Sequence, residues 1–289
     1  MGKAKVPEFE VGYVDIKKAG VFRELISDEA ENRLMEGEPL SLIGLTHGKF
    51  AAGAAAFGME EDHVEIISFY VMPSFRKKGG GSKMLSAIEA VAAELESWVS
   101  ASFLVVNDET RALEAFFESR EYDPRRDLDY KSYLVTLGEC EESDTLRKVK
   151  KDKKLKYFSE LTENKLKSYT KQAETRLAPL PVGGFLSPNV DRELSVVYEV
   201  NGRMEGFLAI EEMDYENGIR LAAAFNGTEN PMVLMWLVKA ALSVAQEKFD
   251  EHTPLLIDVV DETADRFVRY VLDDVEAVSR TYDKVPVKG

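Results

Sequence analysis

The sequence predicts a mixed α/β protein of two similar domains, each a mixed β-sheet flanked by helices. Two stretches align without gaps, LSLIGLTHGK from Leu40 and LSVVYEVNGR from Leu194. The triplet Asp-Glu-Thr recurs at Asp108 and Asp261, each time after an apolar strand and before a helix. Matching segments at nearly constant spacing indicate an internal duplication, so the fold is expected twice along the chain.

Each half is expected to run through the same elements in the same order. A first strand leads to helical material, three strands and a long helix, and then a buried strand, a shorter helix and a terminal hairpin close the unit. Strands clustered first and a strand–helix–strand crossover later favour a mixed sheet with helices on both faces. The expected bounds are 10–16 and 155–161 for the first strands, 21–34 and 163–176 for the first helical segments, and 82–98 and 232–249 for the long helices.

The boundary between the two domains is expected after residue 143, which gives domains of residues 1–143 and 144–289. A basic stretch from Arg147 to Lys156 follows this boundary. Such a stretch is typical of a nucleic-acid or targeting patch, or of a solvated linker that runs into an edge strand. Its place beside the expected boundary favours the linker.

The segment from Val64 to Val91 combines a strand, a glycine-rich loop and an amphipathic helix. Pro73 ends the strand because it cannot donate to a ladder. Glycines let backbone N–H groups converge on a phosphate, and the first turn of a helix favours negative charge. The loop is neither GxxxxGK[ST] nor GxGxxG with a following ribose-binding acid. A flexible turn is the alternative, but strand, proline, arginine and helix together favour an anion-binding site.

The loop fits the pattern RxxGxG from Arg76 to Gly81 and is preceded by Val71-x-Pro73. This resembles motif A of the GCN5-related N-acetyltransferase (GNAT) superfamily, in which the loop wraps the pyrophosphate of acetyl-CoA. The element order of both halves is similar to that of GNAT proteins. The resemblance implies a tandem GNAT-fold protein with acetyl-CoA as co-substrate and no metal. The residues it assigns to the cofactor are Val71, Arg76, Lys77, Lys78, Gly79, Gly80, Gly81, Ser82 and Asn107, the last of which is equally suited to cap a helix.

Acetyl transfer to an amine needs a base, an oxyanion donor and a proton for the leaving thiolate. By the resemblance, Glu65 falls where some GNAT enzymes carry a general base; a solvent-facing carboxylate is the alternative. The N–H of Val71 is the expected oxyanion donor, because the strand should separate from its neighbour there. Phe117 stands where the family commonly has a tyrosine acid. Tyr122, Tyr133 or Tyr130 would then replace it, or solvent would protonate the thiolate.

The second copy reads AFNGTENPMV where the first has its loop, with no cation and with Pro231 at the helix start. Domain two is therefore expected not to bind CoA in the same way. Its long helix around Trp236 is apolar on most sides, which indicates burial. Packing against domain one, packing against a second copy in a homodimer, and a large core helix are the three interpretations.

Composition narrows the class of protein. The net charge of −15 disfavours nucleic acid as a partner. Cys140 is the sole cysteine, which excludes an internal disulfide, and three scattered histidines disfavour a metal site. No apolar run is long enough to span a membrane and no secretory signal is recognisable, so a cytoplasmic location is expected.

The expected function is an acetyl-CoA-dependent N-acetyltransferase with a small-molecule amine or a protein lysine as acceptor. Domain two would be a degenerate copy that helps to shape the acceptor cleft. The alternative is a non-catalytic acyl-CoA-binding or scaffolding module, a pseudoenzyme that kept the loop and lost the acid. An aminoacyl transferase acting on cell-wall precursors also has a doubled fold, but the intact RxxGxG loop disfavours it.

Overall fold

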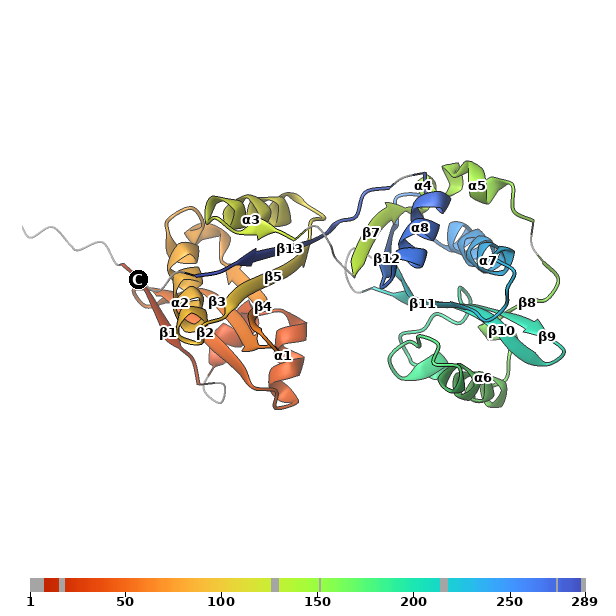
Figure 1. Ribbon diagram of the computed structural model, residues 1–289, viewed down its shortest axis with the longest axis horizontal. Helices are drawn as coiled ribbons and strands as arrows, with labels where there is room; N and C mark the ends of the chain where they lie inside the picture. The colour runs from red at the N-terminus through yellow and green to blue at the C-terminus, as the bar shows by residue number, and fades with distance from the viewer. Residues whose placement is uncertain are drawn as a thin grey trace, which may run out of the picture. The chain divides into compact units, whose positions relative to one another are not determined.

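The computed structural model describes residues 8–15, 19–125, 130–150, 152–213, 218–273 and 275–286. The chain forms two compact units (Figure 1). The first unit comprises Met1–Asp127 with Arg280–Gly289, and the second comprises Leu128–Ser279. Both are mixed α/β units, as the sequence predicts.

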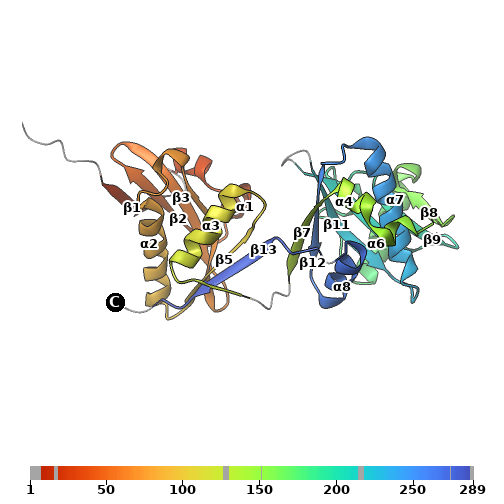
Figure 2. The same ribbon diagram turned by 90° about the horizontal axis from the view of Figure 1, so that it is seen from above.

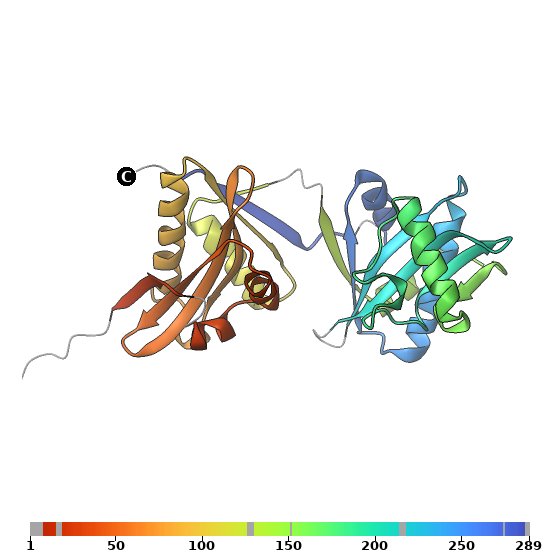
Figure 3. The same cartoon turned by 90° about the horizontal axis from the view of Figure 1, so that it is seen from below.

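The first unit is built on a seven-stranded sheet in the order β1-β2-β3-β4-β5-β13-β6. Helices α2 (Gly80–Glu94) and α3 (Asp108–Ser119) cover one face (Figure 2), where the larger core cluster of this unit lies. The 3-10 helix η2 (Gly20–Leu25) and α1 (Asp28–Met35) cover the other (Figure 3). The strands are β1 (Phe9–Tyr13), β2 (Leu40–His47), β3 (Phe50–Met59), β4 (His63–Val71), β5 (Trp98–Leu104), β6 (Asp123–Pro124) and β13 (Ser279–Lys284).

The second unit is built on a six-stranded sheet in the order β7-β12-β11-β10-β9-β8. Helix α6 (Glu163–Thr175) covers one face (Figure 3), whereas α7 (Met232–Lys248) and α8 (Glu262–Val271) pack on the other. Short helices α4 (Leu137–Glu142) and α5 (Asp144–Arg147) follow β7, and 3-10 turns η4 (Phe158–Glu160) and η5 (Gly184–Leu186) flank α6. The strands are β7 (Lys131–Thr136), β8 (Leu155–Tyr157), β9 (Val196–Val200), β10 (Arg203–Glu212), β11 (Ile219–Asn226) and β12 (Pro254–Val259).

The last strand of the chain belongs to the first sheet. Strand β13 lies between β5 and β6 (Figure 1), and Tyr282 is buried in the core of the first unit. Strand β7 instead pairs with β12, and Tyr133 and Val135 are buried in the core of the second unit. The units therefore differ from the division expected after residue 143, and the terminal hairpins expected for each half do not form.

Two further expectations need correction. The long helix of the first unit ends at Glu94, and Trp98 begins β5 rather than ending the helix. The basic stretch lies inside the second unit, not between units, although it does run into β8 at the edge of that sheet.

Helix α7 is a core helix of the second unit. Val233, Leu237 and Ala241 are buried against the sheet, and the Trp236 ring lies 5.7 Å from that of Tyr198 in β9. These contacts favour the third of the three interpretations of its apolar surface.

The duplication is visible in the strand register. Pairing of β3 with β4 shifts between Ala56 and Phe57 and leaves Ile67 as an extra residue. Pairing of β10 with β11 shifts between Ala209 and Ile210 and leaves Ala222 as its counterpart. A bulge re-aims the strand that follows it. Both units therefore share one backbone irregularity as well as one element order.

None of the described helices is both long and apolar enough to cross a bilayer. Within the described ranges, no group of three or more His, Cys, Asp or Glu side chains is arranged to hold a metal ion.

Candidate functional site

Strands β4 and β5 separate in the first unit. Their parallel pairing covers only His63–Ile66 with Trp98–Ala101. Met72 donates its N–H to Ala52 O in β3 (2.9 Å). Successive N–H groups along a strand point to opposite edges, so the N–H and C=O of Val71 face the opening between β4 and β5. The strand separation expected from the sequence is present.

The loop after β4 depends on its glycines in two ways. Gly79 has φ of +86°, a left-handed conformation that favours glycine, and it immediately precedes α2. A Cβ on Gly80 would lie 2.7 Å from Leu45 Cδ2 and 3.2 Å from the Phe9 ring. Gly81 has only ordinary contacts at its Cβ position. Gly79 sets the turn, and Gly80 lets the helix start against the sheet.

The first turn of α2 presents free donors. The first intrahelical bond runs from Lys83 N to Gly79 O (3.1 Å), so the N–H groups of Gly80, Gly81 and Ser82 precede it. In the described part of the chain, none of these three N–H groups has a hydrogen-bond acceptor. The first turn contains no acidic residue, and Lys77 and Lys78 stand just before its N-cap, Gly79. These features make a site for an anionic group.

Arg76 joins the end of β4 to the start of α3. Its Nε donates to Val71 O (2.8 Å), and its Nη1 and Nη2 donate to the two carboxylate oxygens of Glu109 (3.0 and 3.4 Å). Donation of these hydrogen bonds to Glu109 raises the pKa of Arg76, and the same bonds lower the pKa of Glu109. The guanidinium therefore lies beside the opening, but it is already bound to a carboxylate.

Two lysines of this region also have backbone partners. Lys78 Nζ donates to Ser74 O (2.8 Å), and Lys83 Nζ donates to Phe9 O (3.0 Å). Both side chains are exposed, so an incoming anion can reach them.

Glu65 lies one residue before the point where β4 and β5 separate, and it faces α1. Arg33 Nη1 is 3.6 Å from its carboxylate, and the same guanidinium also binds Glu38 (2.7 Å) and Glu60 (3.0 Å). These carboxylates raise the pKa of Arg33. Glu65 is thus a partly exposed member of an ion-pair cluster at the inner end of the opening.

Phe117 fills the position where a tyrosine is expected, and its ring is part of the core. It is 1% exposed, and its centroid lies 5.8 Å from Phe103, 5.1 Å from Tyr122 and 6.2 Å from Tyr282. The ring therefore stabilises the packing of α3 on the sheet.

Tyr122 lies beside the C-terminal half of α2. Lys284 Nζ is 5.5 Å from its ring centroid and binds Glu89, which is nine positions along the helix from Gly80. That separation is about 14 Å along the helix axis. The Tyr122 hydroxyl is buried without a hydrogen-bond partner among the described residues, and burial raises its pKa. The structure thus does not bring Tyr122 to the loop.

Tyr133 and Tyr130 belong to the second unit. The buried hydroxyl of Tyr133 donates to Asp265 on α8, and burial together with this bond raises its pKa to about 12. Burial likewise raises the pKa of Tyr130. Neither tyrosine lies in the unit that holds Glu65 and the loop.

Asn107 is the N-cap of α3. Its Oδ1 accepts from Thr110 N (3.0 Å) in a capping box, which is the alternative considered for this residue.

The sequence analysis did not identify Arg33 or Glu109 as residues of the site. Glu109 belongs to the repeated Asp-Glu-Thr triplet. That repeat indicated a duplication, but it gave no sign that Glu109 contacts Arg76.

The equivalent loop of the second unit has no comparable set of free N–H groups. Asn226 accepts from Thr228 N, Thr228 accepts from Asn230 N, and Asn230 accepts from Met232 N. Gly227 N donates to Glu205 O (2.8 Å). Four backbone donors of this loop are therefore bound, three to side chains of the loop and one to β10. The register also places Arg220 where the first unit has Glu65.

Residues 12–122 match the sequence model of the acetyltransferase (GNAT) family. No curated protein matches the chain in sequence.

Solved structures share the fold along nearly the whole chain. A tandem GNAT protein from the clavulanic acid biosynthesis pathway is 14% identical with a TM-score of 0.57, over 98% of this chain and 100% of that one. A GCN5-related N-acetyltransferase from Sphaerobacter thermophilus is 16% identical with a TM-score of 0.54, over 97% of this chain and 96% of that one. A glucosamine N-acetyltransferase region in a fungal multi-domain GH3 β-N-acetylglucosaminidase is 13% identical with a TM-score of 0.51, over 96% of this chain and 38% of that one.

Proposed function

Because residues 12–122 belong to the acetyltransferase (GNAT) family within a tandem GNAT fold, we propose that the first unit transfers an acetyl group from acetyl-CoA to a primary amine. The observation that carries this proposal is the set of free N–H groups of Gly80, Gly81 and Ser82 at the end of a strand that has separated from its neighbour. An anion-binding helix start and an adjacent opening suit a ligand with a diphosphate and a linear amide-bearing arm.

Acetyl-CoA supplies the activated acyl group as a thioester. The first-turn N–H groups of α2 would hold its diphosphate, with Lys77 and Lys78 providing positive charge. The N–H of Val71 faces the opening and is suited to an amide or carbonyl oxygen there. Phe116 Cζ and Phe69 Cε1 lie 3.6 and 3.7 Å from the Cβ position of Gly81. These rings therefore border the first turn of α2, beside the proposed diphosphate position.

Glu65 is the proposed general base. It lies at the inner end of the opening, where Arg33 Nη1 is 3.6 Å from its carboxylate. The N–H of Val71 would stabilise the oxyanion, as preorganised backbone donors do in acyl transfer.

The leaving thiolate needs little help from the protein. A thiol has a pKa of about 8.5, close to neutral pH, so water can protonate the thiolate. This accounts for a transferase with Phe117 in place of a tyrosine.

The second candidate function is a non-catalytic acyl-CoA-binding module. The buried ring of Phe117 favours it, because the unit lacks the acid that the family commonly uses. Free thiol release distinguishes the two functions: a transferase releases CoA only when the acceptor is present, whereas a binding module releases none.

The test measures binding and transfer on the full chain. Calorimetry with acetyl-CoA should find one site per chain, and thiol release should follow addition of one class among small amines, polyamines and lysine peptides. Gly81→Val should abolish binding, since its side chain would fill the space next to Val71 and Phe116 that the ligand would need, whereas Ala90→Val, at an exposed position on the same helix, should bind normally. Two equivalent sites, or normal binding by Gly81→Val, would overturn the assignment.

A further inference from the structure

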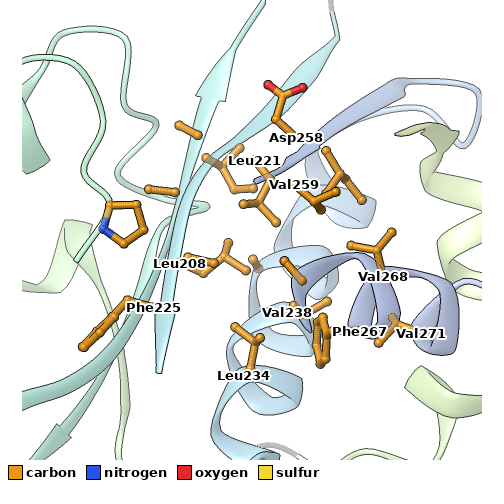
Figure 4. A pocket seen from close by; sticks show the side chains of 18 of the residues that line it. Leu208, Leu221, Phe225, Leu234, Val238, Asp258, Val259, Phe267, Val268 and Val271 are labelled. Atoms are coloured by element: carbon orange, nitrogen blue, oxygen red, sulfur yellow. The ribbon is translucent and has the colours of Figure 1, made fainter. Parts of the chain in front are cut away.

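The second unit contains an apolar cavity of about 940 Å³. Leu208 and Leu221 from the sheet, Val238 from α7 and Phe267 and Val271 from α8 turn their side chains toward a common space (Figure 4). This volume lies within the range of small-molecule sites, about 300–1,000 Å³. No residue of the proposed acetyl-CoA site lines it.

The cavity lies where β11 and β12 separate. Their pairing covers only Ile219–Leu221 with Leu255–Ile257. Beyond these residues, the described pairings give the facing edges of the two strands no partner. Backbone donors and acceptors are therefore available along an otherwise apolar wall, and they suit a ligand with an amide or carbonyl group.

Small side chains create the space. In the first unit, Phe69 lies opposite Ala55, and Phe103 lies two residues beyond the last paired residue of β5. The register places Ala224, opposite Leu208, at the position of Phe69, and Val259 at the position of Phe103. Phe69 and Phe103 both pack against Phe117 in the first unit. The second unit has alanine and valine at the positions of these two phenylalanine rings, and the volume that the rings would fill is left open.

The polar surroundings exclude a charged head group. In the loop before α7, the N–H groups of Thr228, Asn230 and Met232 are bound to side chains of the loop itself, and the loop contains Glu229 but no cation. Arg220 at the cavity edge is held by Asp258, with Nε and Nη2 at 2.9 and 2.8 Å from the carboxylate. The Asp258 carboxylate turns away from the apolar side chains (Figure 4). A phosphate or a free carboxylate would find no unpaired cation among the described residues here.

We infer that the second unit binds a neutral linear acyl chain carrying an amide, with the chain among the apolar side chains and the amide on the free edges of β11 and β12. This site is separate from the proposed acetyl-CoA site and does not depend on transferase activity.

The test uses N-decanoylglycinamide as the neutral acyl amide, titrated into the full chain by calorimetry. Wild type should bind one molecule per chain, about tenfold or more tightly than decanoic acid, because the acid has to give up the hydration of its carboxylate without gaining an unpaired cation. Ala224→Phe, which restores the ring of the first unit, should weaken binding about tenfold or more while acetyl-CoA binding is retained. The matched control is Ala115→Phe at an exposed position on α3, which should bind the amide normally.

Ala264→Leu, at a half-buried position lining the cavity, provides a second variant if Ala224→Phe fails to fold. Absence of amide binding by the folded wild type overturns the inference, as does full affinity in a folded cavity variant. Binding of decanoic acid with equal or higher affinity would overturn the inference that the head group of the ligand is neutral.

Discussion

Arg76 and Glu109 form a two-pronged ion pair that fastens the glycine loop to the first turn of α3 (3.0 and 3.4 Å). The same guanidinium holds Val71 O at 2.8 Å. The cation that the loop pattern assigns to a phosphate is therefore engaged by a carboxylate, and CoA has to compete for it or bind beside it.

Glu109→Gln should strengthen CoA binding about two- to fivefold, the usual range for an exposed ion pair, because it releases Arg76. The gain should shrink at high salt, since the pair is exposed to solvent. Calorimetry at two salt concentrations measures it, with Glu94→Gln at an exposed position in the last turn of α2 as the control. Unchanged or weaker binding would mean that Arg76 acts only as a structural fastener.

Glu65→Gln should lower kcat/KM roughly 10²-fold or more, because a positioned base is lost. CoA affinity should stay nearly constant, because the first-turn N–H groups of α2 are unchanged. Glu60→Gln is the matched control. It removes another carboxylate from Arg33 (3.0 Å) but lies outside β4. The measurement is the steady-state rate of acetyl transfer to the amine that triggers thiol release in the wild type. Equal loss in both variants would assign the effect to the Arg33 cluster, and activity within about threefold of wild type would remove Glu65 as the base.

A fragment of residues 1–143 should be less stable than a fusion that joins residues 1–127 to residues 280–289 through a flexible linker. The fragment lacks β13, which leaves one edge of β5 without a partner strand, and it carries β7, which belongs to the other sheet. An unpaired strand edge favours aggregation.

Thermal melting and CoA titration of the fragment and the fusion make this comparison. Only the fusion should bind CoA with the affinity of the full chain. A soluble 1–143 fragment that melts at the same temperature as the fusion would show that β13 contributes little to the first unit.

Glu199 in β9 should make the second unit sensitive to acid. Lys156 Nζ is 2.6 Å from its carboxylate and the Tyr169 hydroxyl donates to it, and together they lower its pKa to about 2. A depressed folded-state pKa stabilises the fold above the unfolded value of about 4.3, and this contribution is lost as the pH falls toward 2.

Urea unfolding of wild type and Glu199→Gln should therefore differ by about 1–2 kcal/mol at neutral pH, allowing for the exposure of Lys156, and by little near pH 2. Glu193→Gln is the control, since this exposed carboxylate lies 3.5 Å from Lys248. A difference that does not depend on pH would assign the effect to packing rather than to ionisation.

The sequence by itself determined the features that depend on neighbouring residues. The glycine loop, the presence of a long helix after it and the duplicated order of elements all follow from turn chemistry, periodicity and repeated segments. The absence of an equivalent anion-binding loop in the second copy could also be predicted, because it depends on which residues stand in one short loop.

Tertiary structure alone decided which distant segments meet. Strand pairing does not depend on sequence proximity, so β13 joins the sheet whose core accepts Tyr282, and β7 joins the one that accepts Tyr133. The ion pairs of Arg76 and Arg33 connect residues far apart along the chain. The cavity arises because Ala224 occupies the position of Phe69, and a change of volume has a consequence only once the surrounding side chains are in place.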